Sequence, residues 1–266
     1  MINLHSHTEF CDGRASMAEM ARAAREAGFT VWGVSPHSPI LCESGANMKA
    51  EDVSAYLKEA ERLKREYDGK MMILTGMEID YLSPEFGPHI DYFQKLPLDY
   101  RIGSVHFVRT RDVRPVDCDG PAERFLKYLE SEYEGDLRYV AETYFAMELE
   151  MLEAGGFDII GHLDKIGDNG SAADPNLEDY PWYAELVEKV IAKAVEKDVV
   201  IEINTKKYPS SGRFFPSERW WGLLKKYNAK ILLSTDAHYP DRVAAGYQDA
   251  LNRLRVHQLL PQLLAE

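Results

Sequence analysis

The sequence is poor in cysteine, in cationic residues and in long apolar runs. Three cysteines among 266 residues argue against a disulfide framework, because such frameworks use even sets of closely spaced cysteines. No stretch has the length and apolarity of a membrane span, and the N-terminus lacks the basic and apolar regions of a signal peptide. We therefore expect a cytoplasmic protein that has no membrane partner.

Positive charge is scarce relative to negative charge. Lys and Arg number 31 against 44 Asp and Glu, which gives a formal net charge of −13. Such a surface repels phosphate backbones, so we expect no nucleic-acid partner. The composition, 45% hydrophobic and 28% charged, is that of a globular protein. Without a linker, repeat or low-complexity segment, we expect one domain over residues 1–266, and the sequence makes no prediction of oligomeric state.

Short apolar runs alternate with amphipathic helical stretches along the chain. Most of the apolar runs lack polar alternation, as expected for strands covered on both faces. The predicted strands are 2–4, 30–34, 70–79, 99–105, 157–160, 199–203 and 230–233. The predicted helices are 17–28, 50–67, two between 121 and 154, 182–197, 216–227 and 243–260. This order predicts an α/β fold that closes as a distorted (β/α)7 TIM-like barrel, with an open doubly wound sheet as the alternative. The polar segment 110–121 is predicted to be a mobile loop.

Six of the eight histidines follow the carboxyl ends of predicted strands, and three carboxylates occupy similar positions. In a parallel barrel these strand ends share one face, where we expect a metal site. Imidazole and carboxylate groups suit Zn, Mn or Fe, and nine ligands exceed what one ion uses. The sequence therefore predicts two or three divalent ions held by His5, His7, Asp12, His37, Glu78, His106, His162, Asp236 and His238. The remaining histidines, His89 and His257, are expected outside this site.

Cationic side chains near the last strands are candidates for binding an anionic substrate group, with solvated loop charges as the alternative. They are Lys165, Lys206, Lys207, Arg213 and Arg242. Asp236 and His238 are also the candidate catalytic residues, as groups that handle protons. Asp164 follows His162 by two residues and is a candidate to orient an imidazole ring.

The strand-end motifs together resemble the PHP (polymerase and histidinol phosphatase) superfamily. The match runs in the family's order from residue 2 to about residue 240. Its motifs are His5-Ser6-His7, His37-Ser38-Pro39, Gly76-Met77-Glu78, Gly103-Ser104-Val105-His106, Gly161-His162-Leu163-Asp164 and Ser234-Thr235-Asp236-Ala237-His238. Segments 99–107, 156–164 and 202–205 resemble the histidinol-phosphatase branch. The chain departs from many members of that branch at Asp12, where they carry a histidine.

The resemblance implies a (β/α)7 barrel with a trinuclear metal centre. The implied ligand sets are His5, His7, Glu78 and Asp236 for one ion, Glu78, His106 and His162 for a second, and Asp12, His37 and His238 for a third. It also implies a metal-dependent phosphomonoesterase of histidine biosynthesis. Its small phosphorylated substrate would be L-histidinol phosphate, attacked by a hydroxide that bridges the ions.

Two alternatives stay open at this point. One is a PHP phosphoesterase that acts on a nucleotide, a phosphotyrosine peptide or a cyclic phosphodiester. The other is a metal-dependent amidohydrolase, which is disfavoured because Glu78 stands where that fold commonly carries a bridging lysine.

Overall fold

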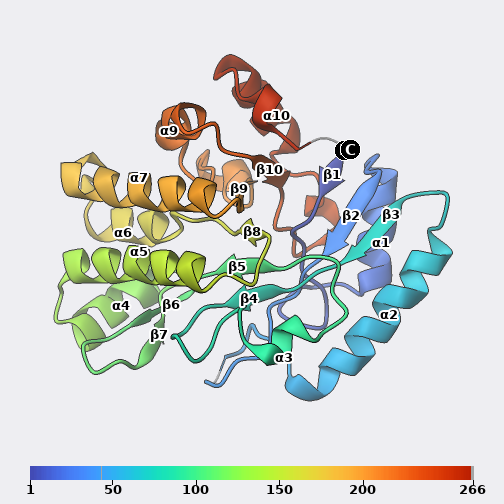
Figure 1. Cartoon of the computed structure of the whole chain (residues 1–266), viewed down its shortest axis with the longest axis horizontal. Coiled ribbons are helices and arrows are strands. Elements are labelled where there is room, and N and C mark those ends of the chain that lie inside the picture. Colours follow the sequence, from blue (N-terminus) through green and yellow to red (C-terminus); the bar gives the residue numbers. More distant parts are fainter. Residues whose placement is uncertain (43, 265–266) are drawn as a thin grey trace.

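Short parallel strands form the centre of the molecule and helices cover them (Figure 1). The computed structural model describes residues 1–42 and 44–264. The strands are β1 (Ile2–Asn3), β2 (Val31–Val34), β3 (Met72–Thr75), β4 (Glu78–Asp80), β5 (Ile102–Ser104), β6 (Phe107–Arg109), β7 (Pro115–Asp117), β8 (Ile159–Ile160), β9 (Val200–Asn204) and β10 (Ile231–Ser234). The α-helices are α1 (Met17–Glu26), α2 (Val53–Glu66), α3 (Asp91–Gln94), α4 (Ala122–Tyr133), α5 (Leu137–Ala154), α6 (Ile166–Ala173), α7 (Pro181–Glu196), α8 (Tyr208–Ser211), α9 (Trp221–Lys226) and α10 (Tyr247–Val256).

The parallel strands form two sheets that continue into one another. Their orders are β1-β2-β3 and β10-β9-β8-β5-β4. Beyond β1 and β10, Ser6 forms a parallel bridge with Ala237, and beyond β2 His37 forms one with Glu78 at the start of β4. The α/β fold with parallel strands is confirmed, and the two bridges give it the course of a distorted barrel. The carboxyl ends of the strands therefore meet on one face.

The predicted strand 70–79 is interrupted at Gly76 and Met77, so the prediction of one continuous strand was wrong. A Cβ at Gly76 would collide with the ring of Tyr100, so the backbone passes that ring closely. The Tyr56 hydroxyl lies within hydrogen-bond distance of the Gly76 carbonyl. The interruption starts a new strand at Glu78 and places its carboxylate at the bridge to His37.

The segment 110–121 is structured rather than the mobile loop that its polar composition predicts. Strands β6 and β7 pair in antiparallel register, with Val108 opposite Val116. Both valines and the following Cys118 are buried. The alternation of these apolar residues with charged ones was the overlooked strand signal. The hairpin fixes residue 119 beside the carboxyl ends of the parallel strands.

Helices on the outside close the core. Helix α5 packs against α6 and α7, and Figure 1 shows α5 and α7 running side by side. Phe145 on α5 and Tyr183 on α7 are fully buried and their rings meet edge to face. The sequence did not predict α6, whose small and polar residues carry no clear apolar stripe. Within the described part of the chain, no helix is long and apolar enough to span a bilayer.

Candidate metal centre

The carboxylate of Glu78 lies at the centre of five imidazole rings. Glu78 is 1% exposed, and it opens β4 directly after the break in the strand. The distances from its carboxylate oxygens to the nearest ring nitrogens are 3.2 Å for His5, 3.5 Å for His7, 2.9 Å for His37, 3.3 Å for His106 and 2.9 Å for His162. One carboxylate is therefore shared by rings from several strand ends.

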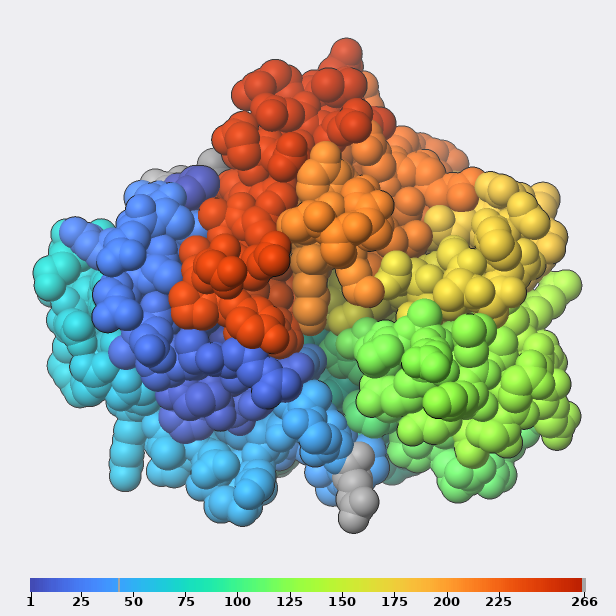
Figure 2. All heavy atoms as spheres, turned by 180° about the vertical axis from the view of Figure 1, so that it is seen from behind, coloured from blue at the N-terminus to red at the C-terminus, as the bar shows by residue number. Residues whose placement is uncertain are grey.

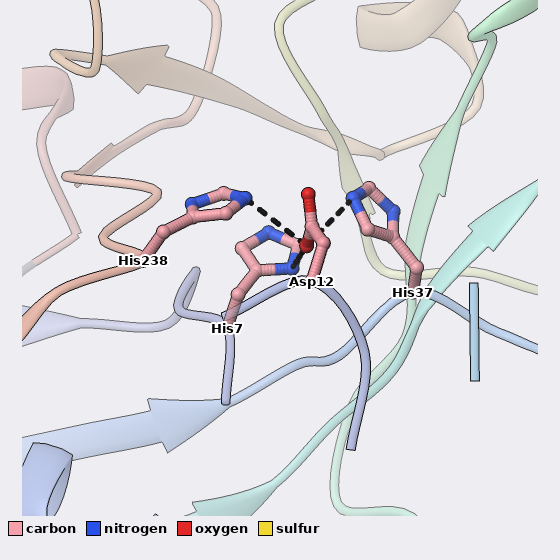
Figure 3. Close-up of side chains that lie close together, drawn as sticks. All are labelled: His7, Asp12, His37 and His238. Carbon is pink, nitrogen blue, oxygen red and sulfur yellow. Dashed lines mark ion pairs between the residues drawn. The ribbon is translucent and has the colours of Figure 1, made fainter. Parts of the chain in front are cut away.

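A second group forms nearer the surface around Asp12 (Figure 3). Its Oδ1 lies 3.2 Å from Nε2 of His238, 3.7 Å from Nε2 of His37 and 3.7 Å from Nδ1 of His7. His7 and Asp12 both follow β1, His37 follows β2 and His238 follows β10. The Asp12 side chain is 29% exposed. Asp12 thus belongs to the outer part of the same cluster.

Asp236 joins the cluster from the end of β10. Its Oδ1 lies 3.0 Å from Nε2 of His7 and 3.8 Å from Nε2 of His5. Asp236 has φ +48° and His162 has φ +24°, so two predicted ligands occupy backbone conformations that side chains other than glycine rarely adopt. Such conformations persist only where the surroundings hold them, and they concentrate at functional sites.

The structure brings all nine predicted ligands together. Ligand atoms that lie within 4.8 Å of one another form four groups: His7–Asp12–His37–His238, His5–Glu78–His162, His5–His7–Asp236 and His37–Asp80–His106. These groups overlap more than the three sets that the family resemblance implies, which share only Glu78. His5, His7 and His37 each belong to two of them.

The polar atoms that face each other across this cluster fit bound cations. Nε2 of His5, Nε2 of His7, Oε2 of Glu78 and Oδ1 of Asp12 are buried. Each lies within 3.2 Å of a ring nitrogen or carboxylate oxygen of the cluster, but none forms a hydrogen bond of acceptable geometry with a described residue. Buried lone pairs without a donor destabilise a fold, and a metal ion satisfies several at once. The residues present therefore fit divalent ions such as zinc.

The charge states of Glu78 and His7 suit cation binding. Burial alone would raise the pKa of Glu78, but the surrounding imidazoles of His5, His37 and His106 hold that pKa well below its ordinary value. Burial, with His238 and His37 nearby, lowers the pKa of His7 well below its ordinary value. Glu78 is thus ionised and His7 neutral near neutral pH, which are the forms that coordinate metals. Burial would lower the pKa of His5 and His106, but the carboxylates beside them raise both pKa values well above the ordinary value, so an ion bound there displaces a proton.

Two buried carboxylates contact the outer nitrogens of candidate ligands and were missed in the sequence. Glu202 Oε1 lies 2.7 Å from His5 Nδ1, and Asp80 Oδ1 lies 2.7 Å from His106 Nδ1. A signal existed for both. Glu202 is charged within an otherwise apolar or uncharged strand, and Asp80 follows Glu78 by two residues, which places both on one face of β4.

A pocket of about 660 Å³ opens beside the outer part of the cluster. Asp12, Asp236 and His238 line it, together with the cationic residues Arg14, Lys165, Lys206, Lys207 and Arg242. The residues that line the pocket come from distant parts of the chain. Figure 2 shows the face on which the N-terminal (blue), middle (green and yellow) and C-terminal (orange and red) parts meet. Four of the five predicted substrate-binding cations, Lys165, Lys206, Lys207 and Arg242, therefore border the pocket.

Most of these cations have a carboxylate partner. Lys206 Nζ lies 3.2 Å from Asp236 Oδ1, and Lys165 Nζ lies 2.9 Å from Asp119 Oδ2. Lys207 is paired with Asp168 on α6, at 2.8 Å. Of these three lysines, Lys206 directly contacts a candidate metal ligand.

Arg213 and Asp164 form an ion pair with each other and do not occupy the positions predicted for them. Arg213 donates to Asp164 Oδ2 at 3.3 Å and to Glu178 Oε1 at 2.6 Å, and it does not line the pocket. Asp164 also accepts the backbone N–H of Ser217 at 2.8 Å. The described contacts give Asp164 no hydrogen bond to an imidazole, so its expected ring-orienting role was wrong. This ion pair instead ties the segment after β8 to the one after β9.

The two remaining histidines lie outside the centre, as expected. His89 Nε2 is 2.9 Å from the Pro84 carbonyl, and His257 Nε2 is 2.8 Å from Glu218 Oε1.

Comparison with known proteins identifies the family. A parallel α/β fold with imidazoles and carboxylates gathered at the strand ends defines a class of metal-binding proteins. The model of the PHP domain matches residues 3–206. The chain belongs to the PHP domain family.

Curated relatives match over most of their length. A probable histidinol-phosphatase of Schizosaccharomyces pombe is 27% identical over 270 residues, covering 95% of this chain and 85% of that protein. A probable histidinol-phosphatase of Deinococcus radiodurans is 26% identical over 264 residues, covering 96% and 93%.

Solved structures share the fold. A putative histidinol phosphatase of Listeria monocytogenes superposes with a TM-score of 0.81 at 20% identity, covering 94% of this chain and 99% of that one. A histidinol phosphate phosphatase of Lactococcus lactis, solved with zinc, L-histidinol and phosphate, gives a TM-score of 0.72 at 20% identity, covering 96% and 93%. At these identities the likeness establishes the fold.

Proposed function

We propose that this chain is a metal-dependent phosphomonoesterase that hydrolyses L-histidinol phosphate to L-histidinol and phosphate. The observation that carries the proposal is the cluster around Glu78, with five imidazoles within 3.5 Å of its carboxylate and a cation-lined pocket beside it. The names of the curated relatives support the choice of substrate.

The proposed cofactors are two or three divalent ions, with zinc favoured over manganese and iron because a structure of similar fold contains zinc. The residues that would hold them are the nine that converge: His5, His7, Asp12, His37, Glu78, His106, His162, Asp236 and His238. When bound, such ions neutralise phosphate oxygens and make water acidic enough to supply a nucleophile near neutral pH.

In this proposal, Lys165 and Lys206 bind and orient the phosphate. Lys206 Nζ lies 3.2 Å from Asp236 Oδ1 and 3.3 Å from His238 Nε2, so the ammonium already stands at the edge of the metal cluster. Lys165 is held near the same pocket by Asp119. A phosphate dianion that enters between these lysines gains two charge-assisted contacts.

Asp236 and His238 are the residues proposed to handle protons. Both line the pocket, and His238 Nδ1 lies 2.9 Å from the Asp236 carbonyl oxygen. If Nδ1–H donates to this carbonyl, the lone pair of Nε2 is directed towards Asp12 and the pocket. In this proposal Nε2 of His238 accepts a proton from the attacking water and gives it to the leaving alkoxide oxygen.

The test is phosphate release from L-histidinol phosphate by the metal-loaded protein, with a chelator-treated sample as the control. The proposal expects turnover that chelation abolishes and that zinc or manganese restores. A phosphotyrosine peptide and a nucleoside monophosphate serve as competing substrates. Preferred turnover of either would overturn the substrate assignment, and no metal-dependent hydrolysis of any of the three would overturn the reaction class.

A further inference from the structure

Glu202 lies at the buried end of the metal cluster. Its carboxylate contacts candidate ligands but is not itself one of them. It lies on β9, is fully buried and uses both carboxylate oxygens. Oε1 lies 2.7 Å from His5 Nδ1. Oε2 accepts the backbone N–H of His162 at 2.9 Å and the side-chain amide of Asn204 at 3.2 Å. One carboxylate therefore contacts donors from the segments that follow β1 and β8 and from β9 itself.

Asn204 extends this contact to β10. Its side-chain nitrogen also lies 3.1 Å from Asp236 Oδ2, and its Oδ1 accepts the backbone N–H of Lys206 at 2.9 Å. Glu202 and Asn204 thus connect His5, His162 and Asp236, which come from three separate strand ends.

We propose that Glu202 is a positioning residue that sets the geometry of two parts of the metal centre at once. A carboxylate at Nδ1 of His5 keeps the proton on that nitrogen and leaves the Nε2 lone pair for a metal. Its second oxygen holds the His162 backbone at φ +24°, the conformation in which His162 Nε2 lies 2.9 Å from Glu78 Oε1. Neither function requires Glu202 to touch an ion.

Asp80 provides the natural comparison, because His106 is the one candidate ligand among the described residues that it hydrogen-bonds, although His37 lies in the same group of ligand atoms. Its Oδ1 lies 2.7 Å from His106 Nδ1, and its Oδ2 accepts the Asn47 side-chain amide at 2.9 Å. Asp80 is as deeply buried as Glu202. The two carboxylates match in burial and in ring contact, and they differ in the number of ligands that they arrange.

The inference rests on the proposed metal centre and is tested by metal affinity. The full-length chain is compared with Glu202→Gln and with Asp80→Asn, each nearly isosteric. Metal-free proteins are titrated with zinc against a chelator of known affinity, and thermal unfolding of the metal-free forms verifies the fold. In Glu202→Gln the side-chain NH2 group must face either His5 Nδ1–H or the His162 N–H. One of these two donors therefore loses its acceptor.

We expect Glu202→Gln to weaken zinc binding by about 10- to 100-fold at two ion positions. We expect Asp80→Asn to weaken binding at one position by a similar factor. Wild-type affinity at every position in Glu202→Gln, or loss at only one position, would overturn the inference. If the wild-type chain binds no divalent ion, the proposed function fails as well, so the two failures are distinguishable.

A measurement on the unaltered chain keeps the inference testable if Glu202→Gln does not fold. In the zinc-loaded protein labelled with ¹⁵N-histidine, NMR is expected to show His5 protonated at Nδ1 with slow exchange of that proton. Protonation of His5 at Nε2 would contradict the role of Glu202.

Discussion

The floor and the mouth of the site differ in how their charges are held. On the floor, His5, Glu78, His162 and Glu202 are at most 1% exposed, and all lie on or just after barrel strands. At the mouth, the side chains of Asp12, Asp119 and Lys206 are 29%, 34% and 31% exposed. The floor is fixed by contacts among its own residues, whereas the mouth residues lie on loops in ion pairs that a ligand can displace. We therefore expect metal binding to depend mainly on the buried residues of the floor, and substrate choice to depend on the loops.

The largest expected effect is removal of the metals. Chelation should abolish phosphate release and also lower the melting temperature, because an ion that binds only the folded state stabilises it and its loss leaves buried lone pairs unpaired on the floor. Activity assays and thermal unfolding, before and after zinc is restored, measure both effects. An unchanged melting temperature would show that the floor holds no tightly bound ion.

Glu78→Gln tests the floor directly. The shared carboxylate contacts five imidazoles, so its neutralisation should reduce activity by at least about 100-fold and reduce the number of bound ions. Metal analysis and phosphate release give the two readouts. Near-normal rates with a full set of ions would contradict the shared role of Glu78.

Lys206→Met tests the mouth. Loss of the ammonium beside Asp236 should raise KM for the phosphate ester by about 10-fold and leave the metal content unchanged, because one charge-assisted contact is lost. Lys207→Met is the matched control, since Lys207 also borders the pocket but is paired with Asp168 on α6. Equal changes in both variants would mean that position relative to the metal cluster does not decide substrate affinity.

The smallest expected effect on activity lies outside both regions, at Glu148 on α5. Burial raises the pKa of Glu148 well above its ordinary value, against a smaller opposing effect of Tyr144. The folded state therefore keeps a proton that the unfolded state releases, and the contribution of Glu148 to stability decreases as pH rises from its unfolded pKa towards its folded pKa. Within that window the expected slope is about 1.4 kcal/mol per pH unit.

Glu148→Gln should remove this slope. The free energy of unfolding of the variant minus that of the unaltered chain is expected to be larger at pH 8 than at pH 5. Phosphate release is expected to be unchanged. Urea unfolding at the two pH values measures the difference, and equal stability differences at both values would show that Glu148 does not titrate as described.

The sequence predicted the floor better than the mouth for a physical reason. Ligands such as His5 and His162 follow strands whose apolar runs are visible in the sequence, and parallel strands must bring their carboxyl ends together. The carboxylates behind them, Glu202 and Asp80, were missed because their partners are distant along the chain. Their charge within buried strands was nevertheless a usable signal.

Loop residues were harder to assign because loop paths do not follow from strand periodicity. Arg213 was predicted at the substrate site, but Asp164 and Glu178 hold it inside the protein. Lys165 was predicted near the substrate, but its partner Asp119 was not, because the unpredicted hairpin of β6 and β7 places that carboxylate beside it. The break in the strand before Glu78 likewise depends on the distant ring of Tyr100.

Anomalous diffraction from crystals of the zinc-loaded protein tests the central claim most directly. The account predicts zinc peaks within about 2.0–2.2 Å of Nε2 of His5 and His7 and of carboxylate oxygens of Glu78 and Asp236. Zinc found only at surface residues, with Glu78 bonded to protonated imidazoles in its place, would contradict it.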